Sequence, residues 1–127
     1  MNRERALKVV LVLVGLLFSA AVVPIVIYFW RGGGEPAADM MLGSLYVIPG
    51  IFLLLAVRNP SANRTLIAFA AWSSFAHGAV MAAQVLTHVI PRSDLWRAVL
   101  PMAIIGVLLI ALAPKKEPAA RAQAASA

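Results

Sequence analysis

The sequence contains no cysteine, and only 5 of its 127 residues are acidic. The lack of cysteine excludes disulfides, thiolate metal ligands and cysteine nucleophiles. No acidic residue falls within any long apolar stretch, and the sequence has no glycine-rich phosphate-binding motif. Because no catalytic set or metal-ligand motif is visible, we expect no catalytic residues, and a non-enzymatic protein is the favoured expectation.

Hydrophobic residues are abundant instead, at 62% of the chain, where a soluble domain has about 45–50%. Four long apolar stretches cover residues 9–30, 40–57, 65–90 and 95–113, of which only the last contains a charged residue, Arg97. Each lies near the length of about 17–25 residues that crosses a bilayer as a helix, and none alternates like a barrel strand. The sequence therefore predicts an all-α integral membrane protein, a four-helix bundle.

Except for Arg97, the basic residues lie outside these stretches, in the connections between them or at the two ends of the chain. The net charge of +6 thus indicates basic membrane-flanking loops and does not favour nucleic acid as a partner. We expect both termini in the cytoplasm, because that topology places more basic residues inside than outside. The inner residues are Arg3, Arg5, Lys8, Arg58, Arg64, Lys115, Lys116 and Arg121, and the outer ones are Arg31, Arg92 and Arg97.

This pattern predicts one four-span domain over residues 1–113 and a disordered cytoplasmic tail over residues 114–127, which are rich in alanine. The expected location is the plasma membrane, as a multi-pass protein of a bacterial inner membrane. An alternative for the first stretch is a secretory signal cleaved near the small residues Ser19, Ala20 and Ala21. Its apolar run continues to Trp30, which favours a retained span.

The third span carries the polar residues. At 100° per residue, Ser73, Ser74, His77 and Gln84 share an arc of about 100°, and His88 joins them if the helix continues to residue 90. His77 lies about 18 Å from the inner end of the span, near the bilayer midplane. An ionisable residue at that depth is a candidate functional residue, although a neutral histidine bonded to Ser73, Ser74 or Tyr46 would also hold helices together.

A row of small residues runs beside this polar arc at four-residue spacing: Ala70, Ser74, Gly78 and Ala82. Small side chains allow helices to approach closely within a membrane. We therefore predict a helix-packing ridge here.

Three spans also contain a proline, at positions 24, 49 and 101, and each proline predicts a bend. In the turn before the third span, Arg58 and Arg64 are expected topology anchors, and Asn59 and Pro60 are expected to form the turn.

The segment from Arg58 to Gln84 resembles the signature of an uncharacterised bacterial family of small four-helix membrane proteins of unknown function. The resemblance rests on the residues Arg58, Asn59, Pro60, Leu66, Ile67, Trp72, Ser73, Ser74, His77 and Met81. Length and number of spans also agree. The layout is more remotely similar to DoxX-like proteins, some of which are associated with quinone-linked sulfur oxidation or respiratory redox systems. The nearer resemblance implies the architecture but no activity.

No cofactor is predicted, but three remain open. A haem held by His77 would need a second ligand from a dimer or from a methionine such as Met81, because His77 and His88 are about 16 Å apart along one helix. Copper is chemically compatible with His88 and methionines 40, 41 and 102. A quinone would accept a hydrogen bond from His77.

Three functions follow as hypotheses. The first is a non-enzymatic accessory or scaffold subunit, with membrane lipids and a homo-oligomer or larger membrane complex as partners. The second is a small quinone-interacting or redox-associated membrane component that uses His77. The third, less favoured, is a small-solute or proton transporter that uses the polar stripe of Ser73, His77 and Gln84.

Overall fold

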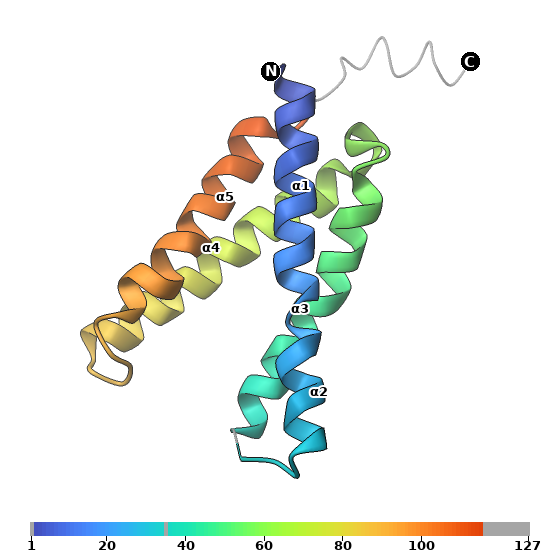
Figure 1. Cartoon of the computed structure of the whole chain (residues 1–127). Helices are drawn as coiled ribbons and strands as arrows, with labels where there is room; N and C mark the ends of the chain where they lie inside the picture. The colour runs from blue at the N-terminus through green and yellow to red at the C-terminus, as the bar shows by residue number, and fades with distance from the viewer. Residues whose placement is uncertain (1, 35, 116–127) are drawn as a thin grey trace.

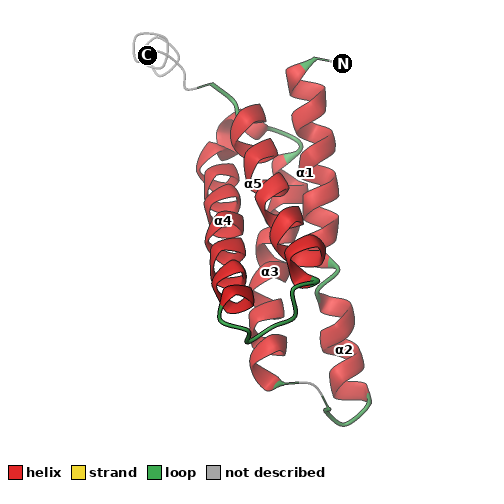
Figure 2. Ribbon diagram, turned by 90° about the vertical axis from the view of Figure 1, so that its left-hand side faces the viewer, coloured by secondary structure: helices red, strands yellow, loops and turns green. Residues whose placement is uncertain are grey.

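The structure is a computed structural model that describes residues 2–34 and 36–115, and in these residues it is helical with no strand (Figure 2). Helix α1 covers Arg3–Ser19, α2 Val22–Trp30, α3 Ala37–Ala56, α4 Arg64–Leu86 and α5 Leu100–Leu112. A short 3-10 helix, η1 (Pro60–Asn63), precedes α4, and a π-helical turn, η2 (Leu95–Val99), precedes α5.

Four helical stretches are long and apolar enough to cross a membrane: Arg3–Trp30, Ala37–Ala56, Pro60–Leu86 and Leu95–Leu112. The prediction of an all-α chain with four such helices is confirmed. The side of the membrane on which each end lies stays a prediction. Residues 116–127, which make up nearly all of the predicted tail, lie outside the described residues.

The first span is two helices rather than one. Pro24 has no backbone N–H, and its ring clashes with the carbonyl four residues earlier, that of Ala20. The chain avoids this clash with a tighter turn, in which the Ala21 N–H donates to the Phe18 carbonyl at 3.1 Å and the Val23 N–H donates to the Ala20 carbonyl at 3.0 Å. The break between α1 and α2 therefore lies just before the proline.

The other two prolines have different effects. Pro49 lies inside α3, which continues past it to Ala56. Pro101 lies in the first turn of α5, where proline is tolerated, and the Leu100 N–H before it donates to the Leu95 carbonyl of η2. The wider π-helical turn η2 leads directly into this proline.

The helices form two pairs. Helix α1 packs mainly on α3, with α2 continuing along α3, and α4 packs mainly on α5. A smaller contact of α1 with α5 joins the pairs, and α3 and α4 touch only weakly. Figure 1 shows that the α4–α5 pair and the α2–α3 pair diverge from the end where α1 begins and α5 stops.

The α1–α3 interface depends on two glycines. A Cβ built on Gly50 would lie 2.6 Å from the backbone nitrogen of Ser19 and 2.9 Å from the Gly15 carbonyl oxygen. A Cβ on Gly15 would lie 3.0 Å from the Gly50 carbonyl oxygen. Since the hydrophobic effect does not drive association between helices in lipid, such close backbone packing is the main source of attraction. The Ser19 hydroxyl is buried here, and no group in the described residues bonds to it.

The α4–α5 interface uses the small residues of α4. Ala70, Ser74 and Gly78 are buried, and a Cβ on Gly78 would lie 3.4 Å from the Cβ of Met102 on α5. In return, the Phe75 ring of α4 covers Gly106 of α5. The first three residues of the predicted ridge are thus buried in the protein interior, against α5. Ala82, the last residue of the ridge, is only half-buried.

The third span ends four residues earlier than its apolar pattern predicted. Helix α4 stops at Leu86, and His88 adopts a left-handed conformation with φ of 59°. The His88 N–H donates to the Val85 carbonyl at 3.1 Å, and the Val89 N–H donates to the Gln84 carbonyl at 2.8 Å. This is a Schellman-type helix end. His88 is therefore exposed in a turn and does not extend the polar arc of the helix.

Replacing Gly50 by alanine tests the α1–α3 interface. The new Cβ would force α1 and α3 apart, so we expect the unfolding free energy to fall by about 1–3 kcal/mol and the thermal midpoint in detergent to drop by several degrees. Gly43→Ala is the matched control, since its Cβ would lie 3.6 Å from the nearest side-chain atom, an ordinary contact. Equal midpoints for the two variants would contradict close packing at Gly50.

Candidate functional site: a polar groove between α3 and α4

A groove of about 880 Å³ lies where α3 and α4 separate. We call it the α3–α4 groove. Its polar lining residues are Asp39, Tyr46, Ser73, His77, Gln84 and Asp94. Its apolar lining residues are Leu42, Gly43, Ala76, Val80, Met81 and Ile90.

Helix periodicity explains why α4 contributes three polar groups. Positions 73, 77 and 84 recur at intervals of four and seven residues, so their side chains lie on one face of the helix. Tyr46 faces them from α3. The rings of Tyr46 and His77 meet edge to face, with centroids 5.5 Å apart, and Phe18 of α1 holds the Tyr46 ring from another side at 5.0 Å.

Four polar side chains of the groove have no hydrogen-bond partner in the part of the chain that the structure describes. Among residues 2–34 and 36–115, the side chains of Ser73, His77, Gln84 and Tyr46 form no hydrogen bond. His77 packs against Tyr46 through the ring contact alone. The bond from His77 to Ser73, Ser74 or Tyr46 that would hold helices together is therefore not present in this part of the chain.

Ser74 is separate from the other three predicted site residues. It is fully buried, and its hydroxyl donates to the Ala70 carbonyl oxygen at 2.8 Å. Adjacent residues on a helix point about 100° apart, so Ser73 faces the groove while Ser74 faces the interior. The structure brings together Ser73, His77 and Gln84, and it places Ser74 in the core.

Two carboxylates line the same groove, Asp39 in the first turn of α3 and Asp94 just before η2. No lysine or arginine is among the lining residues. Asp39 and Asp94 were not predicted as site residues, because each lies outside an apolar stretch and 55 positions from the other. No periodic pattern in the sequence relates these two residues, and only the fold places both beside the groove.

A smaller cavity of about 200 Å³ shares Tyr46, Ser73 and Leu42 with the groove and continues toward Phe18 and Pro49. The groove falls within the roughly 300–1,000 Å³ of typical small-ligand sites, which are mostly apolar with a few polar groups. The arrangement can hold a molecule that has hydrogen-bonding atoms at one part and apolar surface elsewhere.

The residues considered for copper do not share a visible site. Met102 packs at the α4–α5 interface, whereas Met41 on α3 and His88 in its turn are exposed. Within the described residues there is no group of three or more histidine, aspartate or glutamate side chains placed to hold a metal ion. Met81 lines the groove with His77, but both belong to α4.

The turn before α4 is held by its own hydrogen bonds and also bonds to the chain after α5. The Asn59 side chain accepts from the Ala62 N–H at 3.3 Å, and Pro60 begins η1. Arg58 is exposed. Arg64 donates from Nε to the Pro114 carbonyl oxygen at 2.7 Å and so ties the start of α4 to the chain after α5.

Comparison with known proteins identifies one family. A sequence model described as "Family of unknown function (DUF6632)" matches residues 3–125. No curated protein matches the chain, and neither does any solved structure.

Cysteine substitution can test the different settings of the two serines, because the chain has no cysteine of its own. We expect Ser73→Cys to react with a small membrane-permeant thiol reagent at least about tenfold faster than Ser74→Cys, since only an accessible thiolate reacts. The measurement is the labelling rate in membrane vesicles. Thr65→Cys, exposed at the start of α4, provides the upper reference rate. Similar rates at positions 73 and 74 would contradict an open groove.

Proposed function

The chain belongs to the family of unknown function DUF6632, and we propose, from the α3–α4 groove, that it is a non-enzymatic membrane protein that binds a membrane-soluble ligand of the quinone type. The proposal is carried by one observation: Tyr46, Ser73, His77 and Gln84 line a groove of ligand size, and among the described residues they form no hydrogen bonds to protein.

Polar groups in the hydrocarbon region are costly unless they are bonded, so such residues mark ligand or ion sites. A ligand in the groove would satisfy these side chains. The Tyr46 hydroxyl, the His77 ring and the Gln84 amide can each donate a hydrogen bond. A quinone carbonyl accepts such bonds, and its ring is flat enough to pack beside Tyr46.

The apolar lining suits the rest of such a molecule. Leu42, Val80 and Met81 lie beside the polar groups and offer surface to an isoprenoid or alkyl tail. The ligand would be bound and positioned, and no chemical step by the protein is required.

We further propose that the protein lies in the plasma membrane of a bacterium, with both ends in the cytoplasm. Four helices that are long and apolar enough support membrane insertion. Arg3 and Arg64 lie at the same end as the C-terminus of α5, because both bond to backbone carbonyls there. Basic residues gathered at one end favour the cytoplasmic side for that end.

Replacing His77 by leucine tests ligand binding. The loss of one neutral hydrogen bond, worth about 1–1.5 kcal/mol, should weaken binding of a short-chain quinone such as decylubiquinone by about tenfold. The measurement is quenching of tryptophan fluorescence during titration of the protein in lipid nanodiscs. His88→Asn is the matched control, because His88 is exposed in the turn after α4 and asparagine tolerates its left-handed conformation.

The two variants separate the outcomes. Weakened binding in His77→Leu with unchanged binding in His88→Asn supports the proposal. Equal quenching curves for the original chain and both variants would show that decylubiquinone partitions into the lipid without using the groove, and the quinone proposal would fail.

An accessory-subunit role is the second candidate, with a transmembrane helix of a partner subunit as the occupant. The ridge of Ala70, Ser74 and Gly78 is used internally against α5 and offers no surface to a partner. The groove, however, contains the small residues Gly43 and Ala76 on facing helices. Small residues allow a third helix to approach closely, and its polar side chains could bond to His77 and Gln84.

A photocrosslinking residue distinguishes this second role. Placed at Val80, which lines the groove and is exposed, it should form one discrete protein adduct in native membranes if a helix occupies the groove. At Ile104 of α5, which is exposed outside the groove, it should give only lipid adducts. Lipid adducts alone at both positions would contradict a resident partner helix.

A further inference from the structure

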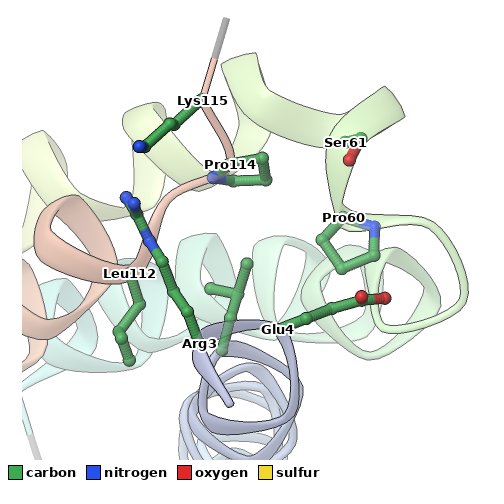
Figure 3. A pocket seen from close by; sticks show the side chains of 8 residues that line it. Arg3, Glu4, Pro60, Ser61, Leu112, Pro114 and Lys115 are labelled. Carbon is green, nitrogen blue, oxygen red and sulfur yellow. The ribbon is translucent and has the colours of Figure 1, made fainter.

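A further cavity lies at the basic end of the molecule, opposite the groove, and shares no lining residue with the groove. It has a volume of about 430 Å³ and is enclosed by the first turns of α1, by η1 and by the chain leaving α5 (Figure 3). Its lining residues are Arg3, Glu4, Leu7, Pro60, Ser61, Leu112, Pro114 and Lys115. We call it the α1–η1–α5 pocket.

Arg3 is fixed in this pocket. Its Nη2 atom donates to the carbonyl oxygens of Ala111 and Ala113, at 3.2 and 2.8 Å, and so satisfies carbonyls at the end of α5 that have no partner within the helix. A guanidinium carries five N–H donors in a rigid plane. The Nε and Nη1 groups, which these two bonds do not use, are therefore held in a set orientation.

Lys115 adds a second positive charge on the same side. Figure 3 shows its ammonium group and the Arg3 guanidinium on one side of the pocket, with the Ser61 hydroxyl and the Glu4 carboxylate on the other. Glu4 is already bonded to Lys8, with 3.1 Å between Oε1 and Nζ. Two neighbouring cations are stabilised by an anion between them, and arginine binds phosphate oxygens with two parallel hydrogen bonds.

The rest of the pocket is apolar. Leu7 is buried, Pro60 is buried, and Leu112 and Pro114 lie beside Arg3. The pocket also lies at the ends of the membrane-length stretches Arg3–Trp30 and Leu95–Leu112. A headgroup with its glycerol backbone has this combination of a charged part and an apolar part, and it occurs at this depth of a bilayer.

We propose that the α1–η1–α5 pocket binds the phosphodiester group of a phospholipid. Arg3 and Lys115 contact the phosphate oxygens, Ser61 donates a hydrogen bond to the headgroup, and Leu112 and Pro114 contact the glycerol and the start of the acyl chains. The bound lipid would hold the end of α5 against α1 and η1.

Native mass spectrometry of the full chain released from detergent tests this site. The probe is dioleoylphosphatidylglycerol, with dioleoylglycerol, which lacks the phosphate, as the comparison lipid. Lys115→Gln should lower the fraction of protein that retains the phospholipid by about three- to fivefold, the effect of one exposed charge contact. Arg58→Gln is the matched control, since it removes the same charge from an exposed residue of the same basic end that does not line the pocket.

Each outcome decides the proposal. Loss in Lys115→Gln with retention in Arg58→Gln, and little retention of dioleoylglycerol, supports it. Equal loss in both variants, or equal retention of the two lipids, would overturn it in favour of unspecific charge or purely apolar binding. Displacement of the phospholipid by an excess of inorganic phosphate would show that the pocket binds phosphate, but as a soluble anion and not as part of a lipid. Lys115 lies outside the groove, so quinone binding should be the same in Lys115→Gln.

Discussion

The close backbone contact between α1 and α3 at Gly15, Ser19 and Gly50 determines how the other helices are placed. Helix α1 touches both α3 and α5, so it connects the two helical pairs, while α3 and α4 touch only weakly. Because the pairs are joined through α1 near one end, they diverge toward the other (Figure 1). The α3–α4 groove is the space that this divergence leaves open.

The sequence predicts the parts of this structure that depend on local chemistry. Hydropathy identifies four membrane-length helices, and helical periodicity places Ser73, His77 and Gln84 on one face. The small-residue row of α4 was also recognised as a packing surface. Its partner could not be named, because periodicity shows which face of a helix is small but not which helix covers it. Met102 on α5 covers Gly78 of this row, and nothing in the sequence singles it out as the partner.

Sequence reasoning missed features that depend on a single conformation or a distant contact. The apolar run to residue 90 conceals the helix end at Leu86, since a histidine in the left-handed conformation at position 88 takes the place that glycine usually occupies. The contact of Gly50 with Ser19 joins residues 31 positions apart on different helices, and neither residue stands out alone. Arg3 and Arg64 were interpreted as charges that set topology, yet both also bond to carbonyls at the end of α5.

The two serines of α4 show how one helix serves both packing and binding. Ser74 is buried and bonds to its own helix, so it costs the packing surface no unpaired polar atom. Ser73, one residue earlier, faces the groove with His77. Since Tyr46 comes from one helical pair and Ser73 and His77 from the other, an occupant bonded to both would join the pairs where α3 and α4 have few contacts of their own. Any molecule that binds only this folded arrangement must stabilise it by mass action. If a small molecule or a helix occupies the groove as proposed, its binding would therefore be coupled to the angle between the two pairs.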